Sequence, residues 1–116
     1  MSKYIFERPL ITAITISASL MTQPAIAQVD ADAAQTLFKQ NECHKCHNPI
    51  KTKKGPSLMK IAAKYKEKKL DEKEAIKHMT NGKKVKLEDG TEEDHKIIDT
   101  KDVKEQANLA RWILSH

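Results

Sequence analysis

Apolar residues recur at helical spacing in four segments of the chain. The predicted helices cover residues 32–41, 58–68, 71–82 and 103–115. Asp71 with Glu74, and Asp102 with Glu105, form Asp-x-x-Glu pairs that are typical of helix N-termini. Gly82 is placed to end the third helix, because glycine adopts the left-handed backbone conformation that closes helices. The pattern predicts an all-α domain with four or so helices.

The segments between these helices are polar and carry residues that break regular structure. Residues 48–57 contain Pro49, Gly55 and Pro56 among several lysines, which predicts a loop. Residues 83–100 are polar and without helical periodicity, so we expect irregular structure there.

The N-terminal segment has the organisation of an export signal. Lys3 and Arg8 precede an uncharged apolar run, residues 10–21, and Ala25-Ile26-Ala27 supplies the small-x-small pattern of a signal peptidase site. A membrane-spanning helix needs roughly 20 apolar residues, and this run is shorter. We therefore predict a secretory signal peptide over residues 1–27 and a mature periplasmic domain over residues 28–116, with no membrane span after cleavage.

The charge of the mature chain indicates which partners to expect. Leaving out Lys3, Arg8 and Glu7 reduces the 21 basic and 16 acidic residues to 19 and 15, a net charge of +4. The lysines are dispersed and aromatic residues make up only 4% of the chain, which argues against nucleic-acid binding. A chain this short buries a modest fraction of its surface and often needs a covalent or metal staple.

The two cysteines define the candidate chemistry. Cys43 and Cys46 lie three positions apart, and His47 follows directly. A disulfide is one use of two cysteines in an exported protein. A thioredoxin-like redox pair needs a βαβ context, and a zinc site needs further ligands, neither of which the sequence supplies. Cys-x-x-Cys-His matches covalent haem attachment, with the cysteines as thioether anchors and His47 as the proximal iron ligand. The predicted cofactor is one haem c.

Several other stretches resemble the class I c-type cytochromes, in particular the small single-haem bacterial kind. The matching stretches are Leu37-Phe38-Lys39, Gly55-Pro56-Ser57-Leu58, Ile61-Ala62-Ala63-Lys64-Tyr65, Asn81-Gly82 and the C-terminal run from Leu109 to Ser115. This resemblance implies a cytochrome c fold with its terminal helices crossing beside the haem. It implies that Phe38 and Trp112 belong to the packed core. It also implies that the carbonyl of Pro56 accepts a hydrogen bond from His47, which fixes the imidazole tautomer.

The sixth iron ligand departs from the family pattern. The family usually supplies a methionine from a proline-rich loop before the last helix, yet residues 83–99 contain neither methionine nor proline. His95 stands 17 positions before Trp112, close to where that methionine falls. We therefore expect His95 to be the distal ligand. Met79 is the alternative, although its place on an apolar helix stripe favours the core, and His78 is expected to be solvated. An open sixth position is the remaining possibility.

The resemblance implies an electron carrier rather than an enzyme. Methionine ligation raises the reduction potential of haem iron, so two histidines imply a lower potential. The expected partners are redox proteins with acidic docking surfaces, which lysines around the haem edge would steer toward the site. The alternative is that these lysines form a solvated surface with no role in docking. The lysines in question are Lys51, Lys53, Lys54 and Lys64. Two other functions stay open: a haem protein with a labile sixth site that binds gases, and an electron-transfer subunit of one redox enzyme.

Overall fold

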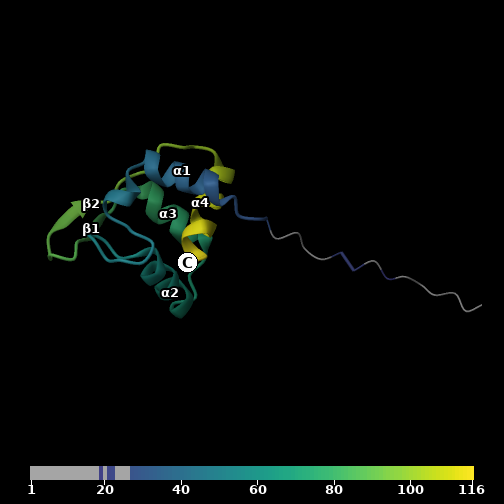
Figure 1. Ribbon diagram of the computed structural model, residues 1–116, viewed down its shortest axis with the longest axis horizontal. Helices are drawn as coiled ribbons and strands as arrows, with labels where there is room; N and C mark the ends of the chain where they lie inside the picture. Colours follow the sequence, from purple (N-terminus) through teal and green to yellow (C-terminus); the bar gives the residue numbers. More distant parts are fainter. Residues whose placement is uncertain (1–18, 20, 23–26) are drawn as a thin grey trace, which may run out of the picture.

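The computed structural model describes residue 19, residues 21–22 and residues 27–116 (Figure 1). Most of the predicted signal peptide, residues 1–27, lies outside the described residues. The described elements, in chain order, are helix α1 (Ala31–Gln40), the 3-10 turn η1 (Cys43–Lys45), helices α2 (Leu58–Glu67) and α3 (Glu72–Asn81), strands β1 (Lys84–Lys86) and β2 (Glu92–Asp94), and helix α4 (Val103–Leu114). Among the described residues, we find no helix with the length and apolar character that crossing a membrane requires.

The four helices lie where the apolar spacing places them, and their ends follow from local hydrogen bonding. The side chain of Asp71 accepts from the N–H groups of Lys73 and Glu74 and caps α3. Gly82 ends that helix with φ of 62°, as predicted. Asp102 caps α4 by accepting from the N–H of Lys104. The expected partner in that cap, Glu105, instead accepts a hydrogen bond from the hydroxyl of Thr100. The mostly α-helical fold class is confirmed.

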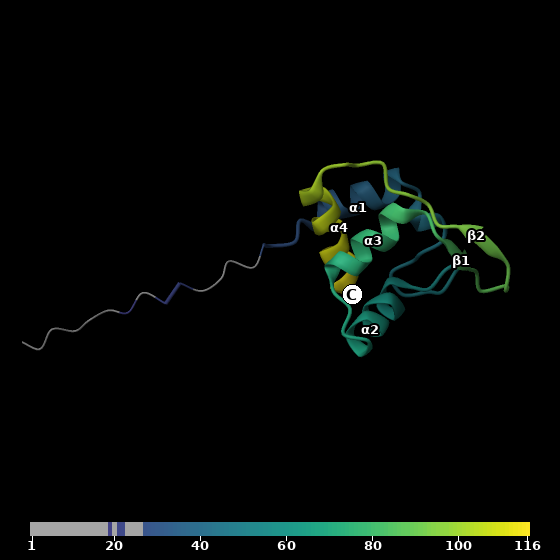
Figure 2. The ribbon, with the colours of Figure 1, turned by 180° about the vertical axis from the view of Figure 1, so that it is seen from behind.

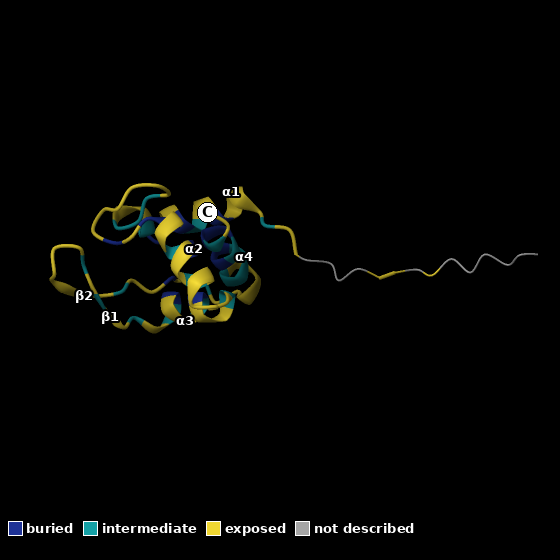
Figure 3. Ribbon diagram, turned by 90° about the horizontal axis from the view of Figure 1, so that it is seen from below, coloured by how far each residue is buried: buried dark blue, intermediate teal, exposed yellow. Residues whose placement is uncertain are grey.

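A small antiparallel hairpin occupies part of the segment that the sequence suggested would be irregular. Lys84 pairs with Asp94, and Lys86 pairs with Glu92, so opposite charges face each other across the two strands. The hairpin projects beyond the helices and is largely exposed (Figures 2 and 3). One hydrogen bond, from the N–H of Glu88 to the carbonyl of Lys54, ties it to the loop that follows the cysteine motif.

The core forms where α4 packs against the other three helices. Leu109 and Ala110 of α4 are fully buried, and Phe38 of α1 meets Trp112 edge-on with ring centres 5.4 Å apart. The placement of Phe38 and Trp112 in the core is therefore confirmed. Met79 of α3 is buried in the same cluster. This core holds the C-terminal end of α1, from which the cysteine motif continues.

Candidate haem site

The cysteine motif occupies a single turn directly after α1. The N–H groups of Cys46 and His47 both donate to the carbonyl of Cys43, at 3.2 and 2.9 Å. Both thiols are free, so the two cysteines do not form a disulfide. Burial raises the pKa of the Cys43 thiol and favours its neutral form. The turn thus presents two thiols and one imidazole together, as attachment of a single haem requires.

His47 is held from behind by the loop that carries Gly55 and Pro56. Its Nδ1 lies 2.7 Å from the carbonyl oxygen of Pro56, as the family resemblance implied. Because a carbonyl only accepts hydrogen bonds, Nδ1 must carry the proton and Nε2 keeps a lone pair for a metal. The N–H of Gly55 also donates to the carbonyl of Cys46, at 3.0 Å, which joins this loop to the motif.

Gly55 packs so closely on His47 that a side chain there should disturb the ring. An added Cβ would lie 2.9 Å from Cε1 and 3.2 Å from Nδ1 of His47. We expect Gly55→Ala to lower the free energy of unfolding by about 1–3 kcal/mol, because overpacking forces neighbours to move. We also expect an altered haem absorption spectrum, because the imidazole must tilt.

The control is Gly90→Ala at the hairpin turn. Gly90 has φ of 87° and open space around it, so alanine there adds backbone strain without touching a histidine. Its spectrum should match that of the wild type. A Gly55→Ala protein with wild-type spectrum and unfolding temperature would contradict a tight contact with His47.

His95 lies at the end of the hairpin and faces His47. Its N–H donates to the carbonyl of Lys83, at 3.0 Å, and its ring centre lies 6.2 Å from that of His47. Its Nδ1 is buried without a hydrogen-bond partner. Burial, with smaller contributions from His78 and His47, lowers the pKa of His95 from 6.5 to about 4. The imidazole is therefore neutral at neutral pH, which is the form that binds a metal.

The geometry of the two rings can be tested against the predicted cofactor. A metal about 2 Å from one nitrogen of each of two opposed imidazoles places the ring centres about 6 Å apart. The observed 6.2 Å agrees with that spacing. The Nδ1 atom of His95 has no hydrogen-bond partner among the described residues, so its lone pair is free for a metal. The residues present therefore fit a haem c attached at the motif turn, with His47 and His95 as the side chains that would hold its iron.

The position of His78 is not evident from the amino-acid sequence. It is an exposed residue of α3, as expected, but its ring centre lies 4.3 Å from that of His95. Although the residue as a whole is exposed, partial desolvation of its imidazole, and then the charges of His47 and Lys64, lower the pKa of His78. His78 is therefore a second imidazole close to the predicted distal ligand. Met79, the other alternative, is turned into the core at 7% exposure.

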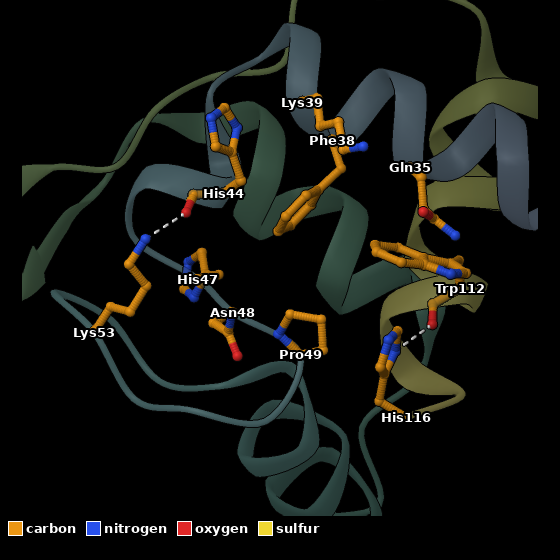
Figure 4. Close-up of a pocket in the computed structure, with 10 residues that line it drawn as sticks. All are labelled: Gln35, Phe38, Lys39, His44, His47, Asn48, Pro49, Lys53, Trp112 and His116. Atoms are coloured by element: carbon orange, nitrogen blue, oxygen red, sulfur yellow. Dashed lines mark hydrogen bonds between the residues drawn. The ribbon is translucent and has the colours of Figure 1, made fainter.

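A cavity of about 460 Å³ has His47 in its lining (Figure 4). It is lined by Gln35, Phe38, Lys39, His44, His47, Asn48, Pro49, Lys53, Trp112 and His116. Two of the interactions around it are hydrogen bonds to backbone carbonyls, from Lys53 to His44 and from the ring of His116 to Trp112. His95 is not among the residues that line this cavity.

Residues 31–116 match the family model for cytochrome c. The chain belongs to the cytochrome c family. Its structure is similar to the crystal structure of the class 1 cytochrome MtoD from Sideroxydans lithotrophicus ES-1, with a TM-score of 0.71 and 47% sequence identity. The match covers 76% of this chain and 97% of that one. No curated protein matches the sequence.

Membership of this family confirms the predicted cofactor and the general activity. A cytochrome c binds one haem c covalently, and Cys43, Cys46 and His47 fit the attachment motif. Members of the family act in electron transfer, and the cytochrome c fold found here is the one that the sequence resemblance implied.

Proposed function

We propose that this cytochrome c carries single electrons between redox proteins in the periplasm, with His47 and His95 as the two axial ligands. Cys43 and Cys46 would form the thioether bonds, and Pro56 would orient His47 through its carbonyl. The observation that carries the proposal is the 6.2 Å separation of the two rings. The periplasmic location rests on the predicted signal peptide.

The side chains of this site determine how the iron behaves. Bound haem supplies a one-electron iron couple, and the protein positions and tunes it. The hydrogen bond from His47 Nδ1 to the Pro56 carbonyl makes the other nitrogen a better electron donor. An imidazole from His95, in place of a thioether, favours the ferric state and lowers the potential. With two imidazoles bound, no position is open to oxygen or other small molecules.

The loop beside His47 is the part of the surface that we propose for partner docking. Three exposed lysines, Lys51, Lys53 and Lys54, lie on the same loop as Pro56, and Lys64 is exposed on α2. Positive charge close to the proposed iron site would steer an acidic partner mainly by raising the association rate.

The absorption spectrum of the purified ferric protein tests the ligand assignment without any substitution. We expect a low-spin spectrum that lacks the weak far-red charge-transfer band of methionine-ligated haem. That band, if present, would assign the sixth position to a methionine such as Met79. A high-spin spectrum would indicate an open site and would favour a gas-binding protein.

A further inference from the structure

The chain on the two sides of the haem site is joined by a small set of long-range contacts. Asn41 and Glu42 immediately precede Cys43, while Lys96 and Asp99 follow His95. The residues of each contacting pair are more than 50 positions apart in the sequence. These contacts therefore connect the turn that carries the cysteine motif, residues 43–47 (the attachment turn), to residues 95–99 (the distal segment).

Asn41 makes the buried half of this connection. It is 7% exposed, and its Oδ1 accepts a hydrogen bond of 2.9 Å from the backbone N–H of Asp99. Its Nδ2 donates to the carbonyl of Leu37 at 3.0 Å, which fixes the amide on the end of α1. Ile98, which precedes Asp99 in the sequence, is 2% exposed, and its N–H donates to the carbonyl of Met79. The chain is therefore held firmly three to four residues after His95.

Glu42 makes the second contact between the two segments, and its backbone adopts a conformation that is uncommon for a residue with a side chain. Its φ is 58°, in the left-handed region where a residue with a side chain is strained and glycine is not. The carboxylate forms ion pairs with Lys45 and Lys96. Hydrogen bonds from those two lysines, Lys45 first, lower the pKa of Glu42 to about 2, so it stays ionised. A side chain at a position where glycine would be less strained points to a use for that side chain, and the ion pair with Lys96 supplies one.

We propose that Asn41 and Glu42 are positioning residues that hold the His95 segment against the attachment turn and so determine how often His95 leaves the iron. The proposal rests on the assignment of His95 as the distal ligand. Hydrogen bonding through the rigid end of α1 limits the segment on one side of His95. On the other side, the N–H of His95 is bonded to the carbonyl of Lys83. Without the contacts of Asn41 and Glu42, the distal histidine is held only on its hairpin side and can swing away from the iron.

The experiment measures how fast an added ligand replaces His95. Cyanide is mixed with the ferric holoprotein, and its binding rate at saturating cyanide reports dissociation of the distal histidine. We expect Asn41→Ala to raise this rate about five- to tenfold, the effect of one or two lost hydrogen bonds. Glu42→Gly should raise it about two- to fivefold, as loss of an exposed ion pair predicts. Hydrogen exchange at the Asp99 amide should accelerate in Asn41→Ala as well.

Two controls separate positioning from general stability. Asn108 also makes two hydrogen bonds through its amide, with the N–H and the carbonyl of Asp30, which caps the end of α1 opposite the cysteine motif. Asn108→Ala should lower the unfolding temperature and leave the cyanide rate unchanged. Lys45→Ala removes the ion pair of Glu42 that does not reach the distal segment, and it should also leave the rate unchanged. Glu42→Gly should exchange ligand faster without a lower unfolding temperature, because glycine relieves the strain.

The outcomes distinguish this inference from the ligand assignment beneath it. If His95→Ala opens the iron but Asn41→Ala and Glu42→Gly exchange cyanide at the wild-type rate, the positioning role is wrong and the assignment stands. If Asn108→Ala accelerates exchange as much as Asn41→Ala, the effect is general loosening and the inference also fails. If His95→Ala leaves both spectrum and exchange unchanged in a His78→Ala background, where His78 cannot take the vacated position, the assignment is wrong and the inference falls with it.

Discussion

Replacing His95 by alanine should convert the ferric protein from low spin to high spin, because alanine has no atom with which to bind iron. His95 is the residue whose ring faces that of His47 at 6.2 Å, and its buried Nδ1 has no other partner. The absorption spectrum and the reaction with carbon monoxide in the ferrous state both report the change. We expect the conversion to be complete and carbon monoxide binding to become rapid.

His78 determines how this experiment must be controlled. Its ring centre lies 4.3 Å from that of His95, near enough to take the vacated position after a modest movement of α3. His78→Ala alone should therefore remain low spin. The double variant, His78→Ala with His95→Ala, should be high spin even if the single His95 variant is not. A high-spin His78→Ala protein beside a low-spin His95→Ala protein would reverse the assignment, and a low-spin double variant would exclude both histidines.

Removing both thiols should abolish covalent haem attachment. In the variant Cys43→Ala with Cys46→Ala, no atom of the attachment turn can bond to a haem vinyl group. Haem-staining of a denaturing gel should show no signal, against full signal for the wild type. The chain should also be less stable, because it is small and loses a large apolar part of its core. Each single variant keeps one thiol and should retain weaker attachment.

His44→Ala is the matched control for the cysteine experiment. His44 lies between the two cysteines and is exposed, and its carbonyl rather than its ring bonds to Lys53. Its replacement should leave the staining intact. Haem that stays on the double cysteine variant under denaturing conditions would overturn the assignment of Cys43 and Cys46 as anchors.

The helices were predictable because their signals are local. Asp71, Gly82 and Asp102 act through hydrogen bonds and backbone conformations within one turn, so the order of residues is enough to locate them. The hairpin was missed for the opposite reason. Its strands have three residues each, and they are held by pairing across the turn and by the contact of Glu88 with Lys54. Neither interaction leaves a periodic pattern.

The amino-acid order alone was sufficient for the cofactor, because attachment of a haem depends on three neighbouring residues, Cys43, Cys46 and His47. It also singled out His95, by its distance from Trp112. Only the tertiary structure brought His95 opposite His47, placed His78 beside it, and joined Asn41 and Glu42 to the distal segment. The physical reason is that each of these contacts joins segments that are distant in sequence. They depend on how α1, α3 and the hairpin pack together, and no local sequence pattern records that packing.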